Sequence, residues 1–318
     1  MNLARYGWNP FFQRQAESLD LEPGRVRLAT ARRAHLFAAG NRVSVSLPRN
    51  LGDVAVGDWL LFDPSEQIAA RVLERQSVLA RKRPGSAPRR QILASNIDGV
   101  VIVTGMDREI SARVVERYLV CACEAGANAV IALNKRDLHG NPDEAVAALS
   151  AALQRFPVVA TSASTGAGLE ELERYLPPGG TIALAGPSGT GKSSLVNALL
   201  EEDHLQVGSV RSRDRRGRHT TTRRELVAHP RGWLLMDLPG VREIHPWSSA
   251  ETVGRVFSEI SEISPNCYYR DCRHGEEPGC AVREAAEAGR IDPARLGSYL
   301  DLRDEQEALS RGLAESGS

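Results

Sequence analysis

Residues 186–193 read GPSGTGKS, the pattern G-x-x-x-x-G-K-[ST] of a phosphate-binding loop. The apolar run TIALA precedes this loop, and the helix-like stretch SLVNALLEE follows it. In such a setting, backbone N–H groups at a helix N-terminus face a phosphate, the lysine reaches the β- and γ-phosphates, and the serine ligates Mg²⁺. A chance glycine-rich turn does not account for the strand and the helix on either side. The predicted phosphate-binding residues are Gly186, Pro187, Ser188, Gly189, Thr190, Gly191, Lys192, Ser193 and Ser194.

Apolar runs on both sides of this loop predict the sheet that carries it. The runs GVVIVTG, AVIALN, FPVVATSA and GWLLMDLPG alternate with helical stretches such as SARVVERYLVCACEAG. Continuous apolar runs indicate strands that are buried on both faces, as in a mostly parallel sheet covered by helices. Ligands bind such a sheet at the carboxyl ends of its strands.

Two further motifs stand at the ends of apolar runs and indicate a guanine base. In the motif NKRD, Asp137 would accept hydrogen bonds from the guanine N1–H and exocyclic amine, while the stem of Lys135 would lie along the ring. The later TSA motif would direct a backbone N–H to the guanine O6. The chain has only three lysines among 40 basic residues, and two of them fall in these nucleotide motifs. The predicted base-binding residues are Asn134, Lys135, Arg136, Asp137, Ser162 and Ala163.

Two segments after the phosphate-binding loop have the composition of nucleotide switches. In DLPG, Asp237 would hold Mg²⁺ through water, and the Gly240 N–H would sense the γ-phosphate. GRHTTTRR offers Thr220, Thr221 and Thr222, one of which should supply a hydroxyl to Mg²⁺; the motif does not choose among them, and we take Thr221 as the candidate. Residues 211–224 hold seven arginines and one acid, which suits a solvated loop or a loop that lies on RNA.

A group that orients the attacking water is less easy to find. In the familiar arrangement a glutamine follows this DxxG motif, whereas this chain has Val241. We therefore expect slow intrinsic turnover, on the order of 10⁻⁴ s⁻¹. His219, beside the switch threonines, is our candidate for the water-orienting residue; the alternative is a surface histidine in a loop. With His219, the predicted catalytic residues are Lys192 and Thr221.

The base motifs precede the phosphate-binding loop, the reverse of the usual order. A circular permutation explains this, since a pocket is held by contacts and not by chain order. The permutation also attaches residues 241 onward directly to the nucleotide-sensing strand. We hypothesise that a displacement of Gly240 is transmitted to the C-terminal region because no long linker separates them.

A cluster of cysteines and a histidine near the C-terminus predicts a metal site. Cys267-x4-Cys272-x-His274-x5-Cys280 supplies three thiolates and one imidazole, a complete tetrahedral set for one structural Zn²⁺. The other two cysteines lie in a helical stretch and read as core packing.

The N-terminal region predicts a small barrel. Residues 24–85 hold about five short alternating or apolar runs separated by turn residues, which fits an OB-type or an SH3-like barrel. Residues 1–95 carry 15 basic against 8 acidic side chains, and residues 251–318 carry 8 against 14. The basic front suits a phosphate-backbone partner or is only a solvated surface. Residues 81–91, RKRPGSAPRRQ, read as a mobile loop or linker.

The chain resembles the RsgA/YjeQ family of small-subunit-dependent GTPases, from GWNPFF to about residue 304. The resemblance lies in the order of the motifs, in GRHTTT and DLPGVREI, and in the run CYYRDCRHGEEPGCAVREAAEAGRID. Leu-Pro inside DxxG and two acids in the metal spacer are modest departures. The resemblance implies a multidomain α/β chain: an N-terminal β-barrel (OB-fold) that binds RNA at 1–90, a circularly permuted P-loop GTPase domain at 91–248, and a C-terminal helical zinc-binding domain at 249–318.

The resemblance also implies late maturation of the 30S subunit, with 16S rRNA as a partner and hydrolysis of GTP to GDP stimulated by the subunit. We expect a monomer. A GTP-dependent binding switch without catalysis is an alternative that Val241 favours, and an ATP-using enzyme is disfavoured by Asp137. The N-terminus lacks the apolar core of a signal peptide, and no run of about 18 apolar residues is present, so we expect a cytoplasmic protein that does not contact membranes.

Overall fold

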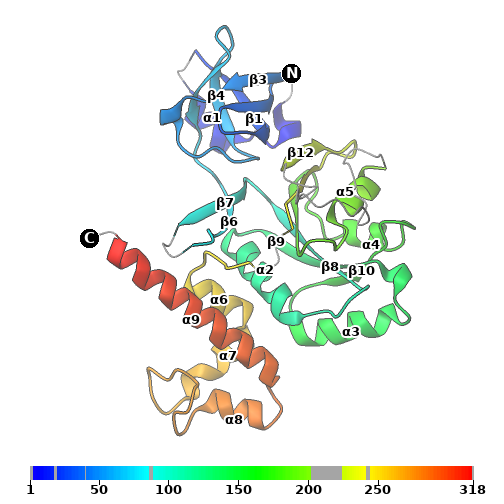
Figure 1. Cartoon of the computed structure of the whole chain (residues 1–318), viewed down its shortest axis with the longest axis vertical. Helices are drawn as coiled ribbons and strands as arrows, with labels where there is room; N and C mark the ends of the chain where they lie inside the picture. Colours follow the sequence, from blue (N-terminus) through cyan, green and yellow to red (C-terminus); the bar gives the residue numbers. More distant parts are fainter. Residues whose placement is uncertain are drawn as a thin grey trace, which may run out of the picture.

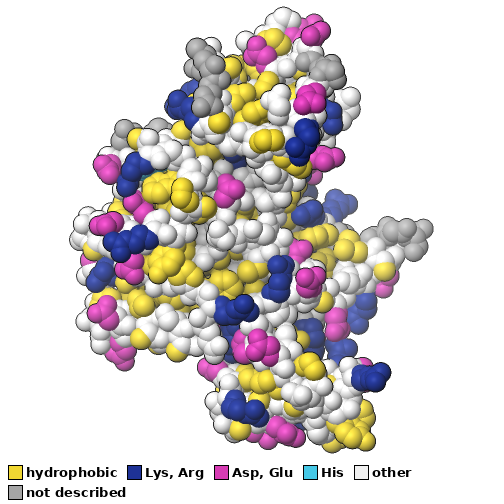
Figure 2. Space-filling model, turned by 180° about the vertical axis from the view of Figure 1, so that it is seen from behind, with side chains coloured by type: hydrophobic (Ala, Val, Ile, Leu, Met, Phe, Trp, Pro, Cys, Tyr) yellow, Lys and Arg dark blue, Asp and Glu magenta, His cyan; other side chains and the backbone are white. Residues whose placement is uncertain are grey.

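The computed structural model describes residues 3–17, 20–39, 41–85, 89–201, 224–240 and 244–316. Figure 1 shows three parts: a barrel at the top, a sheet with helices on both faces in the middle, and a helical part below. From behind, the basic and acidic side chains are interspersed over the surface of all three parts (Figure 2). Among the described residues, no helix is both long and apolar enough to cross a membrane.

The N-terminal part is a closed five-stranded barrel. Its strand order is β1-β2-β3-β5-β4, and β1 pairs with both β2 and β4 to close it. This closed Greek-key order is that of the OB-fold, which settles the choice that periodicity left open. The barrel is preceded by η1 (Leu3–Tyr6) and α1 (Pro10–Ala16); its strands are β1 (Glu22–Ala29), β2 (Arg33–Phe37), β3 (Arg42–Ser46), β4 (Trp59–Asp63) and β5 (Ile68–Val72), with η2 (Arg49–Leu51) before β4.

Arg25 of β1 joins three segments that are distant in sequence. Its side chain is only 2% exposed, and its guanidinium donates to the carbonyl oxygens of Tyr6 at 2.5 Å, Asn96 at 2.6 Å and Gly57 at 3.2 Å. Burial lowers the pKa of Arg25 to about 10, an effect that nearby aspartates oppose. This one side chain therefore ties the N-terminal segment and the barrel to the start of the central part.

A two-stranded hairpin follows the barrel where the sequence predicted a linker. β6 (Val78–Lys82) pairs antiparallel with β7 (Arg90–Ser95), so Arg81 faces Gln91 and Lys82 faces Arg90. The linker prediction for 81–91 was therefore wrong at both ends of that segment. Proline, glycine and charged residues favour a loop, but a segment that contains them can still pair as a strand when a partner lies beside it. Here β6 and β7 are each other's partner.

The central part is a six-stranded sheet of order β10-β9-β8-β11-β13-β12. All neighbours are parallel except β12, which pairs antiparallel with β13 at one edge. Strand β11, which leads into the phosphate-binding loop, lies inside the sheet beside β8. The strands are β8 (Gly99–Gly105), β9 (Asn128–Asn134), β10 (Val158–Ala160), β11 (Thr181–Ala185), β12 (Glu225–Ala228) and β13 (Leu234–Asp237).

Helices cover both faces of this sheet, as the continuous apolar runs predicted. Alternate residues of β8 point to opposite sides, so Val101 packs toward α4 and α5, while Val100 belongs to the core beneath α2 and α3. The helices are α2 (Ala112–Glu124), α3 (Pro142–Leu153), α4 (Leu169–Glu173) and α5 (Lys192–Leu200), with η3 (Arg136–Leu138) after β9.

The C-terminal part is helical and packs on α2. Glu116 of α2 is buried and accepts hydrogen bonds from Arg295 at 2.9 Å and from Ser298, both of α9. Burial raises the pKa of Glu116, and these two donors oppose the rise. The two parts thus share a buried ion pair. The elements are α6 (Ala250–Val256), α7 (Ser258–Ile263), η4 (Ser264–Asn266), α8 (Ala281–Glu287) and α9 (Pro293–Ser316).

Replacing Arg25 tests this account of the barrel junction. Arg25→Met would leave the buried carbonyl groups of Tyr6 and Asn96 without this donor, while the Gly57 carbonyl keeps the Asn96 amide, so we expect the free energy of unfolding to fall by about 3 kcal/mol. Denaturant unfolding followed by the fluorescence of Trp8 and Trp59 would measure it. Arg33→Met, on the exposed start of β2, is the matched control and should change the stability little. Equal losses in the two variants would contradict the role given to Arg25.

Candidate functional site at the carboxyl edge of the sheet

The carboxyl ends of four parallel strands bring the sequence motifs together. Register pairs Leu184 with Asp237, and Ala160 with Leu133, so the residues that follow these strands emerge along one edge. The NKRD, TSA, phosphate-binding and DLPG motifs therefore meet here although the chain visits them in the permuted order. This is the edge at which α/β sheets bind ligands.

Asn134 connects three of the motifs directly. Its side-chain amide donates to the Thr190 carbonyl at 3.0 Å, and its Oδ1 accepts from the Ala163 N–H at 3.1 Å and from the Thr161 hydroxyl at 3.5 Å. Asn134 is only 1% exposed. The side chain thus fixes the phosphate-binding loop against the TSA loop. The sequence predicted that a backbone N–H of the TSA motif meets the guanine O6; of that motif, the Ala163 N–H donates to Asn134 in this structure.

Asp137 lies exposed at the mouth of this edge. The hydroxyl of Ser162 donates to its Oδ1 at 2.6 Å, and this hydrogen bond lowers the pKa of Asp137. The carboxylate is therefore ionised near neutral pH and can accept two N–H donors from a ligand. The backbone of Arg136 is held on both sides: its N–H donates to the Thr161 carbonyl at 3.0 Å, and its carbonyl accepts from the His139 N–H at 3.2 Å.

Lys192 turns into the phosphate-binding loop. Its ammonium donates to the carbonyls of Gly186 at 3.1 Å and Pro187 at 2.9 Å. Burial lowers the pKa of Lys192 to about 8, and the charge of Asp237 opposes this shift. A buried ammonium held by carbonyls alone is poorly compensated, so an anion in the loop would stabilise it.

Ser193 and Asp237 form the pair expected of a magnesium site. The Ser193 hydroxyl donates to Asp237 Oδ2 at 2.5 Å, while Oδ1 of the same carboxylate is buried and has no hydrogen-bond partner among the described residues. Burial raises the pKa of Asp237, and the Ser193 hydrogen bond and the charge of Lys192 oppose that rise. A hydroxyl and a carboxylate with an unsatisfied oxygen match the oxygen ligands of Mg²⁺.

Close backbone approach explains two glycines of the site. A Cβ built on Gly240 would lie 2.6 Å from Ser188 Cα and 2.8 Å from Lys192 Nζ. Gly191 has a φ of +89°, and a Cβ there would lie 2.4 Å from the Asn134 amide nitrogen. The DLPG segment therefore abuts the phosphate-binding loop.

The sequence analysis missed two residues of this site, Asp107 and Arg108. Lys135 donates to Asp107 at 2.7 Å and to the Gly189 carbonyl at 2.7 Å. The Arg108 guanidinium lies 3.4 Å from the carbonyl oxygens of both Ser188 and Gly189. Asp107 and Arg108 stand two and three positions after the apolar run GVVIVTG, so the rule that functional residues follow parallel strands would have found them.

The remaining predicted site residues divide into two groups. Ser194, half-buried, lies in the first turn of α5. His219, Thr221 and Val241 lie outside the described residues, and so does most of the arginine-rich stretch 211–224.

The Cys/His cluster has the dimensions of a tetrahedral metal site. The ligand atoms of Cys267, Cys272, His274 and Cys280 all lie within 4.8 Å of one another. Two distances from His274 Nδ1 are 3.6 Å to Cys267 Sγ and 3.5 Å to Cys280 Sγ, and the two sulfurs are 3.9 Å apart. A tetrahedron with Zn–S bonds of about 2.3 Å has edges of about this length.

A neighbouring hydroxyl orients the imidazole of this cluster. His274 Nε2 lies 3.2 Å from the Ser264 hydroxyl, which leaves Nδ1 directed at the sulfurs. Three thiols and one imidazole leave no position for a substrate, so the set fits a structural zinc rather than a catalytic one.

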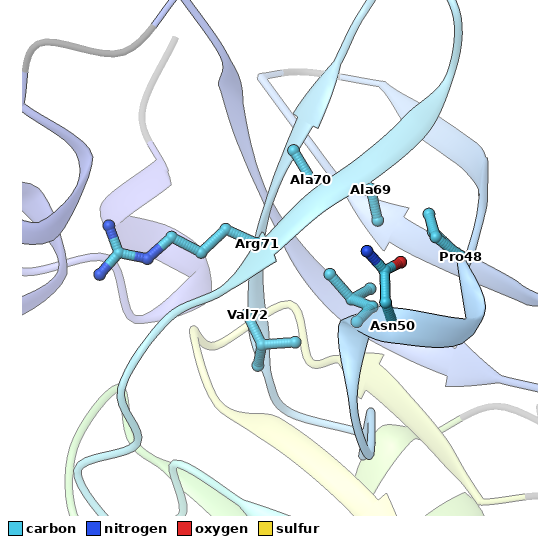
Figure 3. A pocket seen from close by; sticks show the side chains of 7 residues that line it. Pro48, Asn50, Ala69, Ala70, Arg71 and Val72 are labelled. Carbon is cyan, nitrogen blue, oxygen red and sulfur yellow. The ribbon is translucent and has the colours of Figure 1, made fainter.

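A hollow on the barrel offers no comparable chemistry. It has a volume of about 390 Å³ and is lined by residues of η2 and β5. Figure 3 shows that Arg71 points away from Asn50, so these polar groups do not converge. The sheet edge therefore remains the candidate site.

Comparisons with known proteins agree with this geometry. The family model described as RsgA GTPase matches residues 72–247. The chain is 41% identical to the small ribosomal subunit biogenesis GTPase RsgA of Opitutus terrae, over 98% of this chain and 91% of the relative. It is 38% identical to the protein of that name from Mesorhizobium japonicum, over 96% and 90%.

Two solved structures share the fold. YjeQ from Thermotoga maritima has a TM-score of 0.64 and 27% identity, covering 90% of this chain and 98% of its own. YloQ, described as a circularly permuted GTPase, has a TM-score of 0.63 and 22% identity, covering 92% and 97%. The permuted order inferred from the motifs is therefore present in a structure of the same fold.

Removing one ligand tests the metal site. We expect native mass spectrometry to find one zinc per chain, and Cys272→Ser to abolish it because three ligands bind Zn²⁺ far more weakly than four. Cys123→Ser, a half-buried cysteine of α2, is the matched control and should keep the zinc. A wild-type chain that is free of zinc yet unfolds cooperatively in its C-terminal part would contradict the assignment.

Proposed function

Since this chain belongs to the RsgA GTPase family and is therefore a GTP hydrolase, we propose that it acts in the biogenesis of the small ribosomal subunit, binding that subunit and being stimulated by it. Family membership removes two alternatives left by the sequence, an ATP-using enzyme and a binding switch without catalysis. The names of the relatives, which are 35–43% identical, support the biological process.

One observation carries the assignment of the nucleotide site. Asn134 contacts both Thr190 and Ala163, so the base motif, the base-support loop and the phosphate-binding loop share one rigid corner. We propose that a guanine lies against Asp137 and the TSA loop, and that the triphosphate enters the loop of residues 186–194. The exposed, ionised carboxylate of Asp137 suits the two N–H donors of guanine.

Different residues of the chain would contact the phosphates and the magnesium ion. Lys192 would exchange its two loop carbonyls for β- and γ-phosphate oxygens, and the backbone N–H of Gly240 would meet the γ-phosphate. Ser193, Asp237 and Thr221 would hold Mg²⁺, which supplies charge neutralisation at the β- and γ-oxygens. His219 would orient the attacking water once the subunit orders the arginine-rich loop, since Val241 cannot hydrogen-bond water through its side chain.

The other parts of the chain would serve the encounter with the subunit. We propose that residues 1–90 form the RNA-binding domain, that 91–248 form the GTPase domain, and that 249–318 form a domain held by one structural zinc. The excess of basic residues at the N-terminus supports contact with 16S rRNA. A monomer that works in the cytoplasm is consistent with this role.

Phosphate release with and without 30S subunits tests the function. We expect slow basal turnover, and a rise of at least about tenfold on adding subunits, because the subunit would bring a water-orienting group to bear on the γ-phosphate. Lys192→Ala is the control and should lose both rates. An unchanged rate at saturating subunit concentration would refute subunit-stimulated hydrolysis.

Base choice tests the corner around Asp137. Asp137→Asn should move the preference from GTP toward xanthosine triphosphate, because the amide can donate to the carbonyl that replaces the guanine exocyclic amine. Competition binding with the two nucleotides would measure it, and Asp143→Asn on α3 is the matched control. Unchanged GTP affinity in the Asp137 variant would remove this residue from the base site.

A further inference from the structure

A charged groove is lined by residues of the barrel, of the β6–β7 hairpin and of the chain just before β12. Figure 1 shows where these elements lie. The groove has a volume of about 420 Å³, too large for a lone ion. We call it the junction groove; its lining residues include Thr30, Asp53, Arg83, Arg90, Arg224 and Pro239. Its walls are fixed, since Arg27 of β1 pairs with Glu225 of β12, and Arg81 forms a β-bridge with Pro246.

The junction groove is lined by more basic than acidic side chains. Arg83, Arg90 and Arg224 come from three different segments, and Asp53 is the one acid among the described lining residues. None of these three arginines forms an ion pair with a described residue. The hairpin segment 78–95 holds five basic residues and no acid. On the face seen in Figure 2, basic and acidic side chains are interspersed.

The charged form of Arg224 is destabilised by its surroundings. Its guanidinium is half-buried and donates to the Ile92 carbonyl at 3.3 Å. Burial lowers the pKa of Arg224, and the like charge of Arg81 lowers it further. A chain that keeps two arginines together without a carboxylate gains from an anion that joins them.

We propose that the junction groove binds the sugar-phosphate backbone of RNA. The proposal rests on the proposed function, since it names the surface that meets the rRNA. Phosphate contacts come mostly from arginine and lysine and fix a protein's register on the nucleic acid. The described lining residues include no aromatic ring on which a base could stack, which favours backbone contacts over base reading.

The position of Pro239 gives this surface a consequence for hydrolysis. Pro239 belongs to the DLPG motif and lines the junction groove, while the next residue, Gly240, abuts Ser188 and Lys192. RNA in the groove would therefore contact the segment that senses the γ-phosphate. Binding at this surface and the state of the nucleotide would bias one another, as linkage requires.

Neutralising the two exposed arginines of the groove tests the proposal. Arg83→Gln with Arg90→Gln keeps side-chain length and removes two charges, so we expect affinity for 30S subunits to fall about tenfold or more in the presence of a non-hydrolysable GTP analogue. The slope of log affinity against log salt should become shallower by about 1 to 2. The control pair is Arg174→Gln, exposed at the C-cap of α4, with Arg311→Gln, exposed on α9, and it should bind like the wild type. Thermal unfolding would check that each variant is folded.

The outcomes separate this inference from the function on which it rests. If the wild type does not bind 30S subunits, the proposed function fails. If the wild type binds and the groove variant binds as tightly with the same salt slope, the junction groove is not the RNA surface. A second arm uses protein-free 16S rRNA: a variant that loses the subunit but keeps the free rRNA would place a ribosomal protein in the groove and overturn the RNA assignment.

Discussion

The nucleotide site depends on one buried amide. Asn134 ends β9, and its side chain spans the space between the Thr190 carbonyl and the Ala163 N–H. An aliphatic residue there would leave both partners unsatisfied in a place that water does not reach. This contact requires that strands β9, β10 and β11 lie close together in the sheet. It does not depend on the order in which they occur along the chain. The inverted motif order is thus compatible with an unchanged pocket.

Much of this architecture was legible in the sequence because periodicity and local motifs report local structure. The runs around GPSGTGKS predicted buried parallel strands, and the spacing from Cys267 to Cys280 predicted a closed metal set whose ligand atoms the fold brings together. The OB-type order of the barrel was not legible from periodicity, since it depends on β1 pairing with β4 across more than thirty residues. Strand pairing of that kind is set by tertiary contacts, not by local pattern.

What the sequence could not reveal are long-range polar contacts made by single side chains. Nothing in GRVRLATA distinguishes the buried Arg25 from the partly exposed Arg27 two residues later, because regular alternation would place both on the same side of a strand. In the structure the register of β1 shifts between Val26 and Leu28. The difference arises from which carbonyls the folded chain presents. The hairpin at 78–95 was missed for a related reason. Its two basic segments have the composition of a solvated linker, and only the folded structure shows that they pair with each other.

The buried pair of Glu116 and Arg295 has a consequence for the nascent chain. Glu116 emerges from the ribosome 179 residues before Arg295 and 182 before Ser298. Until those donors are made, the face of α2 that carries this carboxylate must remain in water, since its burial alone would leave a charge uncompensated. The central sheet can therefore form during translation, but its outer helical layer is completed only when nearly the whole chain has been synthesised. Folding of this chain would thus be completed only near its release from the ribosome that synthesises it.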